Sequence, residues 1–119
     1  MTARNLVLVI DDELHIREAL CDILELIGLP TLTACDGREG SAQFVLRRAE
    51  SGLVILDWMM PVMDGAETLL ALRTLDPQVK VLISSGLDEQ ELSQRIGRTA
   101  NLSMPNAFLQ KPYKGRGKK

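Results

Sequence analysis

The stretch Leu53-Val54-Ile55-Leu56-Asp57 is a short apolar run that ends at a carboxylate. Three other apolar runs stop at polar residues in the same way: Leu6–Ile10 before Asp11 and Asp12, Val79–Ile83 before Ser84 and Ser85, and Ala107–Leu109 just before Lys111. Such runs, separated by helical stretches, indicate βαβ units with parallel strands. Right-handed crossovers bring the carboxyl ends of these strands to one edge, where ligands bind. We therefore expect carboxylates, a hydroxyl and an ammonium to meet in one crevice, which suits a cation and a phosphoryl group.

Length and composition are those of one globular domain. The chain has 119 residues, of which 45% are hydrophobic and 25% charged. No run approaches the roughly 20 apolar residues of a membrane span. Residues 1–5 lead directly into the first strand without a signal-peptide pattern. We expect a cytoplasmic protein without a membrane partner.

Charge is distributed unevenly along the chain. The net charge is −2, yet five of the fourteen basic residues lie at the C-terminal end: Lys111, Lys114, Arg116, Lys118 and Lys119. The remainder is acidic and carries no basic stripe interleaved with aromatic residues, which excludes direct nucleic-acid binding as the expected function. We expect residues 1–113 to form the domain and the glycine-containing residues 114–119 to be disordered. The two cysteines, Cys21 and Cys35, are expected to be small buried or half-buried side chains.

Helical periodicity fills the gaps between the strands. The first helix is expected to begin at a cap formed by Asp12 and to bury an apolar stripe, Ile16, Leu20, Ile23, Leu24 and Ile27. A short strand over Thr31 to Cys35 follows. Asp36-Gly37 then opens a second helix, with an expected buried face of Ala42, Val45, Leu46 and Ala49.

The later helices carry clearer boundary signals. Asp64 with Glu67 three residues later is typical of a capping box, and Pro77 follows the end of that helix. Acidic residues after Asp88 predict a short fourth helix whose apolar stripe is only Leu92 and Ile96. Residues 97–106 are predicted to be a loop.

The three acids are ambiguous one by one but informative together. An Asp-Asp pair after a strand is more often a turn or a helix cap than a metal site, and Asp57 could also be a cap. Three carboxylates at one strand edge would repel each other unless a divalent cation neutralised them. The arrangement of Asp11, Asp12 and Asp57 therefore favours Mg²⁺ as the cofactor.

Four motifs in order resemble the receiver domain of two-component response regulators. They are Val9-Ile10-Asp11-Asp12-Glu13, the string from Leu56 to Gly65, Ser84-Ser85-Gly86, and Phe108-Leu109-Gln110-Lys111-Pro112. The resemblance covers about Leu6 to Tyr113. It implies a flavodoxin-like, doubly wound α/β fold with a parallel five-stranded sheet of order 2-1-3-4-5, and a phosphoryl group taken from a histidine kinase or phosphotransfer protein.

The resemblance also implies a role for each matching residue. Asp57 would be the phospho-acceptor. Asp12 would ligate Mg²⁺ directly, Asp11 mainly through water, and the backbone carbonyl of Met59 would be a further ligand. Ser85 would hydrogen-bond a phosphoryl oxygen, and Lys111 would pair first with Asp57 and then with the phosphoryl group. Phe108 matches the switch aromatic that turns inward with the hydroxyl residue, although a plain core residue is an equally good interpretation.

The chain departs from the family pattern at its C-terminal end. Members normally continue into an amphipathic fifth helix, which residues 114–119 do not encode. A bare sheet face makes a second copy of the chain a candidate partner.

The chain would be a stand-alone receiver or part of a larger protein, and a signalling domain rather than an enzyme. Two alternatives are an interaction module that no longer uses phosphate and a Mg²⁺-dependent phosphatase of the haloacid-dehalogenase type, which needs a second Asp where this chain has Met59.

Overall fold

The computed structural model describes residues 4–99 and 102–111. Strands and helices alternate along this part of the chain. The elements in order are β1 (Leu6–Ile10), α1 (Leu14–Leu26), β2 (Thr31–Ala34), α2 (Gly37–Arg47), β3 (Ser51–Asp57), α3 (Gly65–Leu75), β4 (Val81–Ser85), α4 (Glu89–Gly97) and β5 (Ala107–Gln110). Within these residues no helix has the length and apolar content needed to cross a bilayer.

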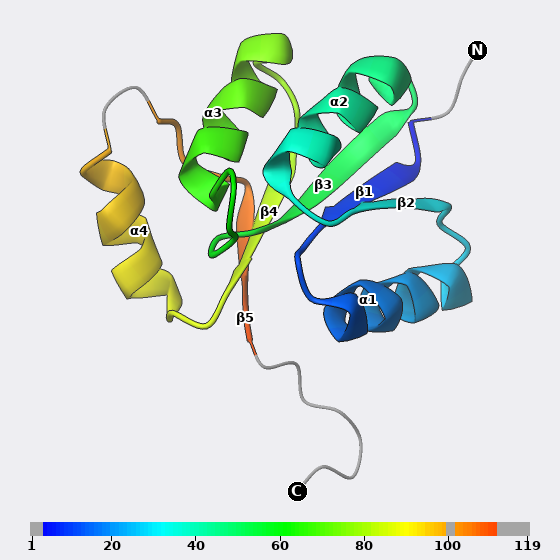
Figure 1. Cartoon of the computed structure of the whole chain (residues 1–119), viewed down its shortest axis with the longest axis horizontal. Helices are drawn as coiled ribbons and strands as arrows, with labels where there is room; N and C mark the ends of the chain where they lie inside the picture. The colour runs from blue at the N-terminus through cyan, green and yellow to red at the C-terminus, as the bar shows by residue number, and fades with distance from the viewer. Residues whose placement is uncertain (1–3, 100–101, 112–119) are drawn as a thin grey trace, which may run out of the picture.

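The strands form one parallel sheet of order β2-β1-β3-β4-β5, which confirms the predicted topology. Helices α2, α3 and α4 lie on one face of the sheet, and α1 lies on the other (Figure 1). In the register of the two central strands, Ile10 is opposite Leu56. The residues that follow them, Asp11 and Asp57, are therefore neighbours at the carboxyl edge.

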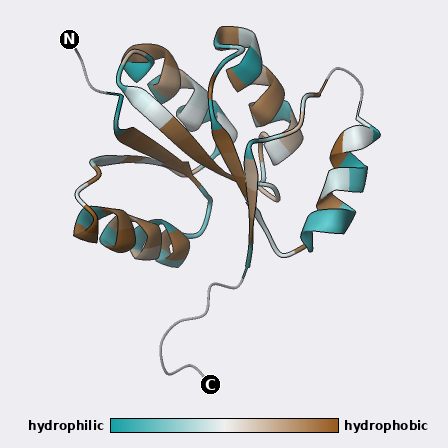
Figure 2. Ribbon diagram, turned by 180° about the vertical axis from the view of Figure 1, so that it is seen from behind, coloured by the Kyte–Doolittle hydropathy of each residue, from teal (hydrophilic) through white to brown (hydrophobic). Residues whose placement is uncertain are grey.

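The core has two parts because side chains alternate between the faces of a strand. Leu8 and Ile10 of β1 belong to the larger cluster, which includes side chains from α2, α3 and α4. Val7 and Val9 belong to a smaller cluster with Leu20 and Leu24 of α1. Figure 2 shows the strands as apolar along much of their length. These buried contacts fix the positions of the carboxyl ends of β1 and β3, where Asp11 and Asp57 lie.

Helix α1 differs from the prediction in two respects. Leu20 and Leu24 are buried, but Ile23 and Ile27 are 52% and 66% exposed. The apolar periodicity is real, yet α1 meets the sheet along a narrower stripe than the sequence pattern suggested. The predicted cap by Asp12 is also wrong, because Glu13 occupies the N-cap position and makes no side-chain cap. Asp12 instead joins the acidic cluster described below.

The predicted buried face of α2 is wrong. Val45 and Leu46 are 57% and 80% exposed, and Ala42 and Ala49 are also exposed. The buried residues are Gly37, Gly40 and Phe44. A Cβ atom on Gly40 would lie 2.7 Å from Cγ1 of Ile10. Glycine therefore lets α2 approach the sheet closely, and this approach determines which face of the helix is buried.

We expect Gly40→Ala to lower the free energy of unfolding by about 1–3 kcal/mol, because the added methyl group overlaps a fully buried side chain. Denaturant unfolding of the purified chain measures the change. Gly97→Ala is the matched control, since its Cβ would meet no atom closer than 4.0 Å. That variant should be neutral or stabilised by up to about 1 kcal/mol. Equal stability of Gly40→Ala and the wild type would contradict the close approach of α2.

The other boundary predictions have mixed outcomes. Asp36 caps α2, and the capping box of Asp64 and Glu67 at α3 is present, as predicted. Helix α4 is short and buries Leu92 and Ile96. Strand β4 begins and ends two residues later than predicted, and it therefore includes Ser84 and Ser85.

The remaining sequence predictions concern the cysteines and the C-terminal end. Cys21 is half-buried, but Cys35 is exposed, which contradicts the prediction for it. Strand β2 ends at Ala34, so Cys35 lies just beyond the sheet. The predicted disordered tail, residues 114–119, lies outside the described residues. Among the described helices, α1 alone covers its face of the sheet (Figure 1). On the edge strand β5, no residue is fully buried.

Candidate phosphoryl and metal site

The carboxyl edge of the sheet gathers three aspartates. Asp11 follows β1 and Asp57 ends β3, and their side chains are 2% and 3% exposed. Asp12, the next residue after Asp11, is exposed. One carboxylate oxygen from each of the three lies within 4.8 Å of the others. The residues that the sequence placed at one edge are thus brought together in space.

Lys111 supplies the positive charge in this crevice. Its Nζ lies 3.1 Å from Asp11 Oδ2, 3.2 Å from Asp57 Oδ1 and 3.3 Å from Glu13 Oε1. The backbone N–H of Lys111 donates to the carbonyl oxygen of Ser85 at 2.6 Å, which ties the end of β5 to the end of β4. The ammonium is therefore aimed at Asp57 by the sheet itself.

The site perturbs the proton affinity of its charged groups. Burial, and secondly the negative charge of Asp11, raise the pKa of Asp57 to about 7, against the opposing effect of Lys111. Burial lowers the pKa of the Lys111 ammonium, but its contacts with Asp11 and Asp57 outweigh burial and raise that pKa above its ordinary value. Lys111 therefore stays charged at neutral pH, and the crowded Asp57 needs additional positive charge nearby to be fully ionised.

Without metal, we expect stability to fall as the pH rises from about 4 to about 7. A carboxyl group whose pKa is 3.8 in the unfolded chain and about 7 in the folded chain binds its proton more tightly when folded. As the pH rises from about 4 to about 7, the unfolded chain releases this proton before the folded chain does. The free energy of unfolding therefore decreases over this range. In EDTA, Asp57→Asn should be more stable than wild type at pH 8 by roughly 2 kcal/mol, and this advantage should shrink at pH 5.

Urea unfolding at the two pH values measures this effect. Asp22→Asn is the control, because Asp22 lies on the exposed surface of α1. Parallel pH curves for wild type and Asp57→Asn would show that Asp57 titrates normally in the folded chain.

The aspartates fit a divalent cation. Oδ1 of Asp11 accepts from the backbone N–H of Glu13 at 2.9 Å, whereas Oδ2, although near Lys111, is buried and makes no hydrogen bond. The Lys111 ammonium pairs with that oxygen at 3.1 Å, but three clustered carboxylates carry more negative charge than one ammonium can neutralise. Carboxylate oxygens are also the donors that Mg²⁺ prefers. This part of the chain can therefore hold a metal ion.

The remaining predicted site residues lie around the same edge. Ser85 ends β4, is buried, and its Oγ accepts from the backbone N–H of Leu87 at 3.0 Å. Met59 is 67% exposed, and its backbone N–H donates to Asp57 Oδ1 at 3.4 Å. Phe108 of β5 is half-buried against the larger core cluster. Phe108 therefore packs at the margin of this cluster and is partly exposed to solvent.

Two features of the site were not predicted from the sequence. Glu13 contacts Lys111, and the only sequence signal was its position directly after the aspartate pair. Arg17 Nη1 donates to the backbone carbonyl oxygen of Asp11 at 2.7 Å and so supports the turn after β1. Neither contact follows from helical or strand periodicity.

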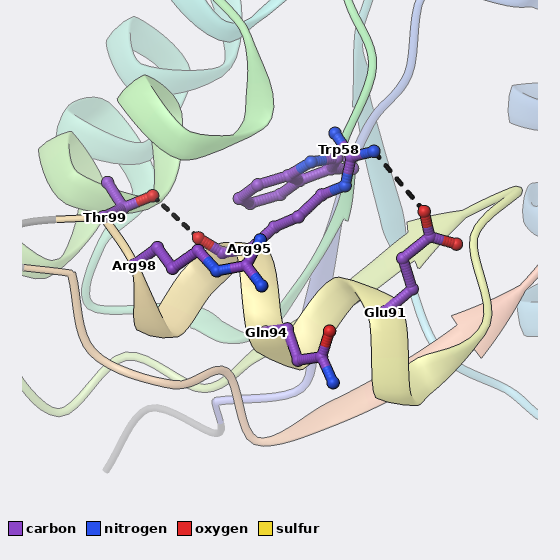
Figure 3. A pocket seen from close by; sticks show the side chains of 6 residues that line it. All are labelled: Trp58, Glu91, Gln94, Arg95, Arg98 and Thr99. Carbon is purple, nitrogen blue, oxygen red and sulfur yellow. Dashed lines mark hydrogen bonds and ion pairs between the residues drawn. The ribbon is translucent and has the colours of Figure 1, made fainter.

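A hollow of about 590 Å³ lies beside the site, between α4 and the residue after Asp57. Trp58 and Arg95 both line this hollow (Figure 3), and the guanidinium of Arg95 forms an ion pair with Glu91. The Nη2 atom of Arg95 lies 3.4 Å from Oε2 of Glu91. None of the clustered aspartates lines this hollow, so it is separate from the acidic cluster at the carboxyl edge.

Comparison with protein families gives a match to the response regulator receiver domain over residues 7–116. The chain belongs to the response regulator receiver family. A receiver domain is the part of a response regulator that acts in two-component signalling. This receiver domain has the fold expected for its family, a five-stranded parallel sheet of order β2-β1-β3-β4-β5.

Similar curated proteins include regulators from several bacteria. The receiver domain is 34% identical over 112 residues to the C4-dicarboxylate transport transcriptional regulatory protein DctD of Pseudomonas aeruginosa, covering 93% of this chain and 23% of that protein. It is 28% identical over 102 residues to sporulation initiation phosphotransferase F of Bacillus subtilis, covering 83% of this chain and 81% of that protein. The chain thus corresponds to under a quarter of the first relative and to most of the second.

Solved structures show the same fold. Chemotaxis protein CheY4 of Vibrio cholerae, crystallised at low pH, is 28% identical with a TM-score of 0.78, covering 96% of this chain and 90% of that one. Response regulator TrrA of Thermotoga maritima, solved in complex with Mg²⁺ and a beryllium fluoride, is 27% identical with a TM-score of 0.73, covering 95% and 89%.

Proposed function

We propose that this receiver domain accepts a phosphoryl group on Asp57 from a phosphohistidine of a histidine kinase or phosphotransfer protein. The observation that supports this most directly is the placement of a buried carboxylate 3.2 Å from the Lys111 ammonium and among two further aspartates. A buried acid is costly without a cationic partner, and an acid that receives a phosphoryl group needs positive charge, here from Lys111, close to the transferred group.

In the transfer step, an Asp57 oxygen forms a bond to phosphorus as the bond from phosphorus to the histidine nitrogen breaks. The electron pair of the broken bond stays on that nitrogen, and Asp57 becomes an acyl phosphate. Little covalent chemistry is asked of the protein, so alignment and charge stabilisation supply most of the rate. The Lys111 ammonium would pair with the Asp57 carboxylate before the transfer and with a phosphoryl oxygen after it.

Asp11, Asp12 and Asp57, with the backbone carbonyl of Met59, would hold Mg²⁺. The bound ion would neutralise the crowded carboxylates and the charge on the phosphoryl oxygens. Beryllium fluoride with Mg²⁺ in the related TrrA structure supports this cofactor.

Ser85 and Phe108 would form the switch. Ser85 Oγ now accepts a hydrogen bond from Leu87, and turning toward a phosphoryl oxygen would change that contact. Phe108, on the neighbouring strand β5, would then move further inward.

Residues 1–113 would make up the domain, which would act in the cytoplasm as a signalling module. The domain would also catalyse hydrolysis of its acyl phosphate, which transfers the phosphoryl group to water. A homodimer through the sheet face left bare near β4 and β5 remains a prediction.

Incubation of the chain with Mg²⁺ and acetyl phosphate tests the proposal. Intact mass spectrometry should show one added phosphoryl group that is stable in acid and labile in base, and none when EDTA replaces Mg²⁺. Absence of labelling by acetyl phosphate and by a panel of phosphorylated histidine phosphotransfer proteins would contradict phospho-acceptance and favour an interaction module that does not use phosphate.

A further inference from the structure

Glu13 contributes a carboxylate to Lys111 that is separate from the metal-holding group. Its Oε1 lies 3.3 Å from Lys111 Nζ, yet Glu13 is not a member of the cluster formed by Asp11, Asp12 and Asp57. The exposure of the Glu13 side chain is 60%, against 2% and 3% for the two buried aspartates on the same ammonium. Glu13 therefore meets Lys111 from the solvent side, at the mouth of the site.

The backbone holds Glu13 in this position. Its N–H donates to Asp11 Oδ1 at 2.9 Å, and its carbonyl oxygen accepts from the N–H of Arg17 at 3.1 Å. Although Glu13 is the N-cap residue of α1, its side chain makes no cap hydrogen bond. The carboxylate is therefore not used to stabilise the helix end and is directed to Lys111 instead.

An ammonium group has three N–H donors, and three carboxylates surround this one. An incoming phosphoryl group must take one of these donors, and it carries negative charge past Glu13 to reach Asp57. We propose that Glu13 competes with the phosphoryl group for the Lys111 ammonium and so slows its entry. Glu13 is a positioning residue that sets the rate of phosphorylation, an inference that rests on the proposed function.

Glu13→Gln tests this inference, because the amide keeps the size and an acceptor oxygen but removes the charge. With acetyl phosphate, saturating Mg²⁺ and low salt, the first-order labelling rate should rise about three- to tenfold. The donor's phosphorus–oxygen bond breaks as acetate leaves with the electron pair and Asp57 gains the phosphoryl group. Raising the ionic strength should reduce the difference between the variant and the wild type, since exposed charges are screened.

Glu18→Gln is the matched control, with the same charge change on an exposed residue of α1. Its labelling rate should stay within about twofold of wild type. The Mg²⁺ affinity of Glu13→Gln should also stay within about threefold of wild type, because Glu13 is not a proposed ligand. That affinity is a readout that separates competition for Lys111 from damage to the metal site.

The outcomes separate this inference from the proposed function. A wild-type chain that is labelled, with Glu13→Gln no faster than wild type, overturns the role of Glu13 and leaves phospho-acceptance by Asp57 intact. A gain that persists at high salt, or an equal gain in Glu18→Gln, also overturns it. A wild-type chain that takes no label from any donor overturns both.

Discussion

Asp57→Asn should abolish phosphoryl labelling of the chain, whereas the wild type gains one group in Mg²⁺ and acetyl phosphate. The amide is nearly isosteric with the carboxylate but lacks its nucleophilic oxygen charge. It also removes the like charge next to Asp11, so the variant should fold at least as well as wild type. Loss of label therefore reports chemistry rather than unfolding.

Intact mass spectrometry and peptide mapping measure this result. Asp22→Asn, a substitution of the same kind on the exposed surface of α1, should be labelled like wild type. Undiminished labelling of Asp57→Asn would move the acceptor to another residue, and peptide mapping would identify it.

Asp12→Ala should weaken Mg²⁺ binding by at least roughly tenfold, about 1.4 kcal/mol or more. Asp12 is exposed, so its removal leaves no cavity, yet its oxygen lies within 4.8 Å of those of Asp11 and Asp57. A loss of affinity in this variant can therefore be assigned to the missing ligand. Titration calorimetry of both chains measures the affinity directly.

The same variant should be no less stable than wild type in EDTA, because one of three crowded negative charges is gone. Asp36→Ala is not a suitable control, since Asp36 caps α2, whereas Asp22→Ala changes an exposed acid without a cap. An Asp12→Ala titration that overlays the wild type would place the cation away from the acidic cluster.

Strand patterns in the sequence were reliable because buried parallel strands require apolar residues on both faces. The run before Asp11 and the run before Asp57 both form inner strands of the sheet, and the strand order that the family resemblance implied is confirmed. The candidate site followed from the same reasoning, since the carboxyl ends of parallel strands share an edge. Asp11, Asp57 and Lys111 meet there as expected.

Helix faces were predicted less well, because hydrophobic periodicity says which side is apolar but not what packs against it. Val45 and Leu46 of α2 are exposed, while Gly40, which carries no hydrophobic signal, is buried against Ile10. In α1, Ile23 continues the apolar stripe but is 52% exposed. The partner surface, rather than the helix, decides which of its apolar residues are buried.

Local apolar patterns and the rules of chain crossover predicted the parallel sheet and the set of acids at its carboxyl edge. The strand order came from the resemblance to receiver domains. Neither could predict how α2 approaches the sheet through its glycines, or which carboxylates share the Lys111 ammonium. These last features depend on contacts between residues far apart in the chain: Glu13 and Lys111 meet only when β5 lies beside β4 and the start of α1 reaches the same edge.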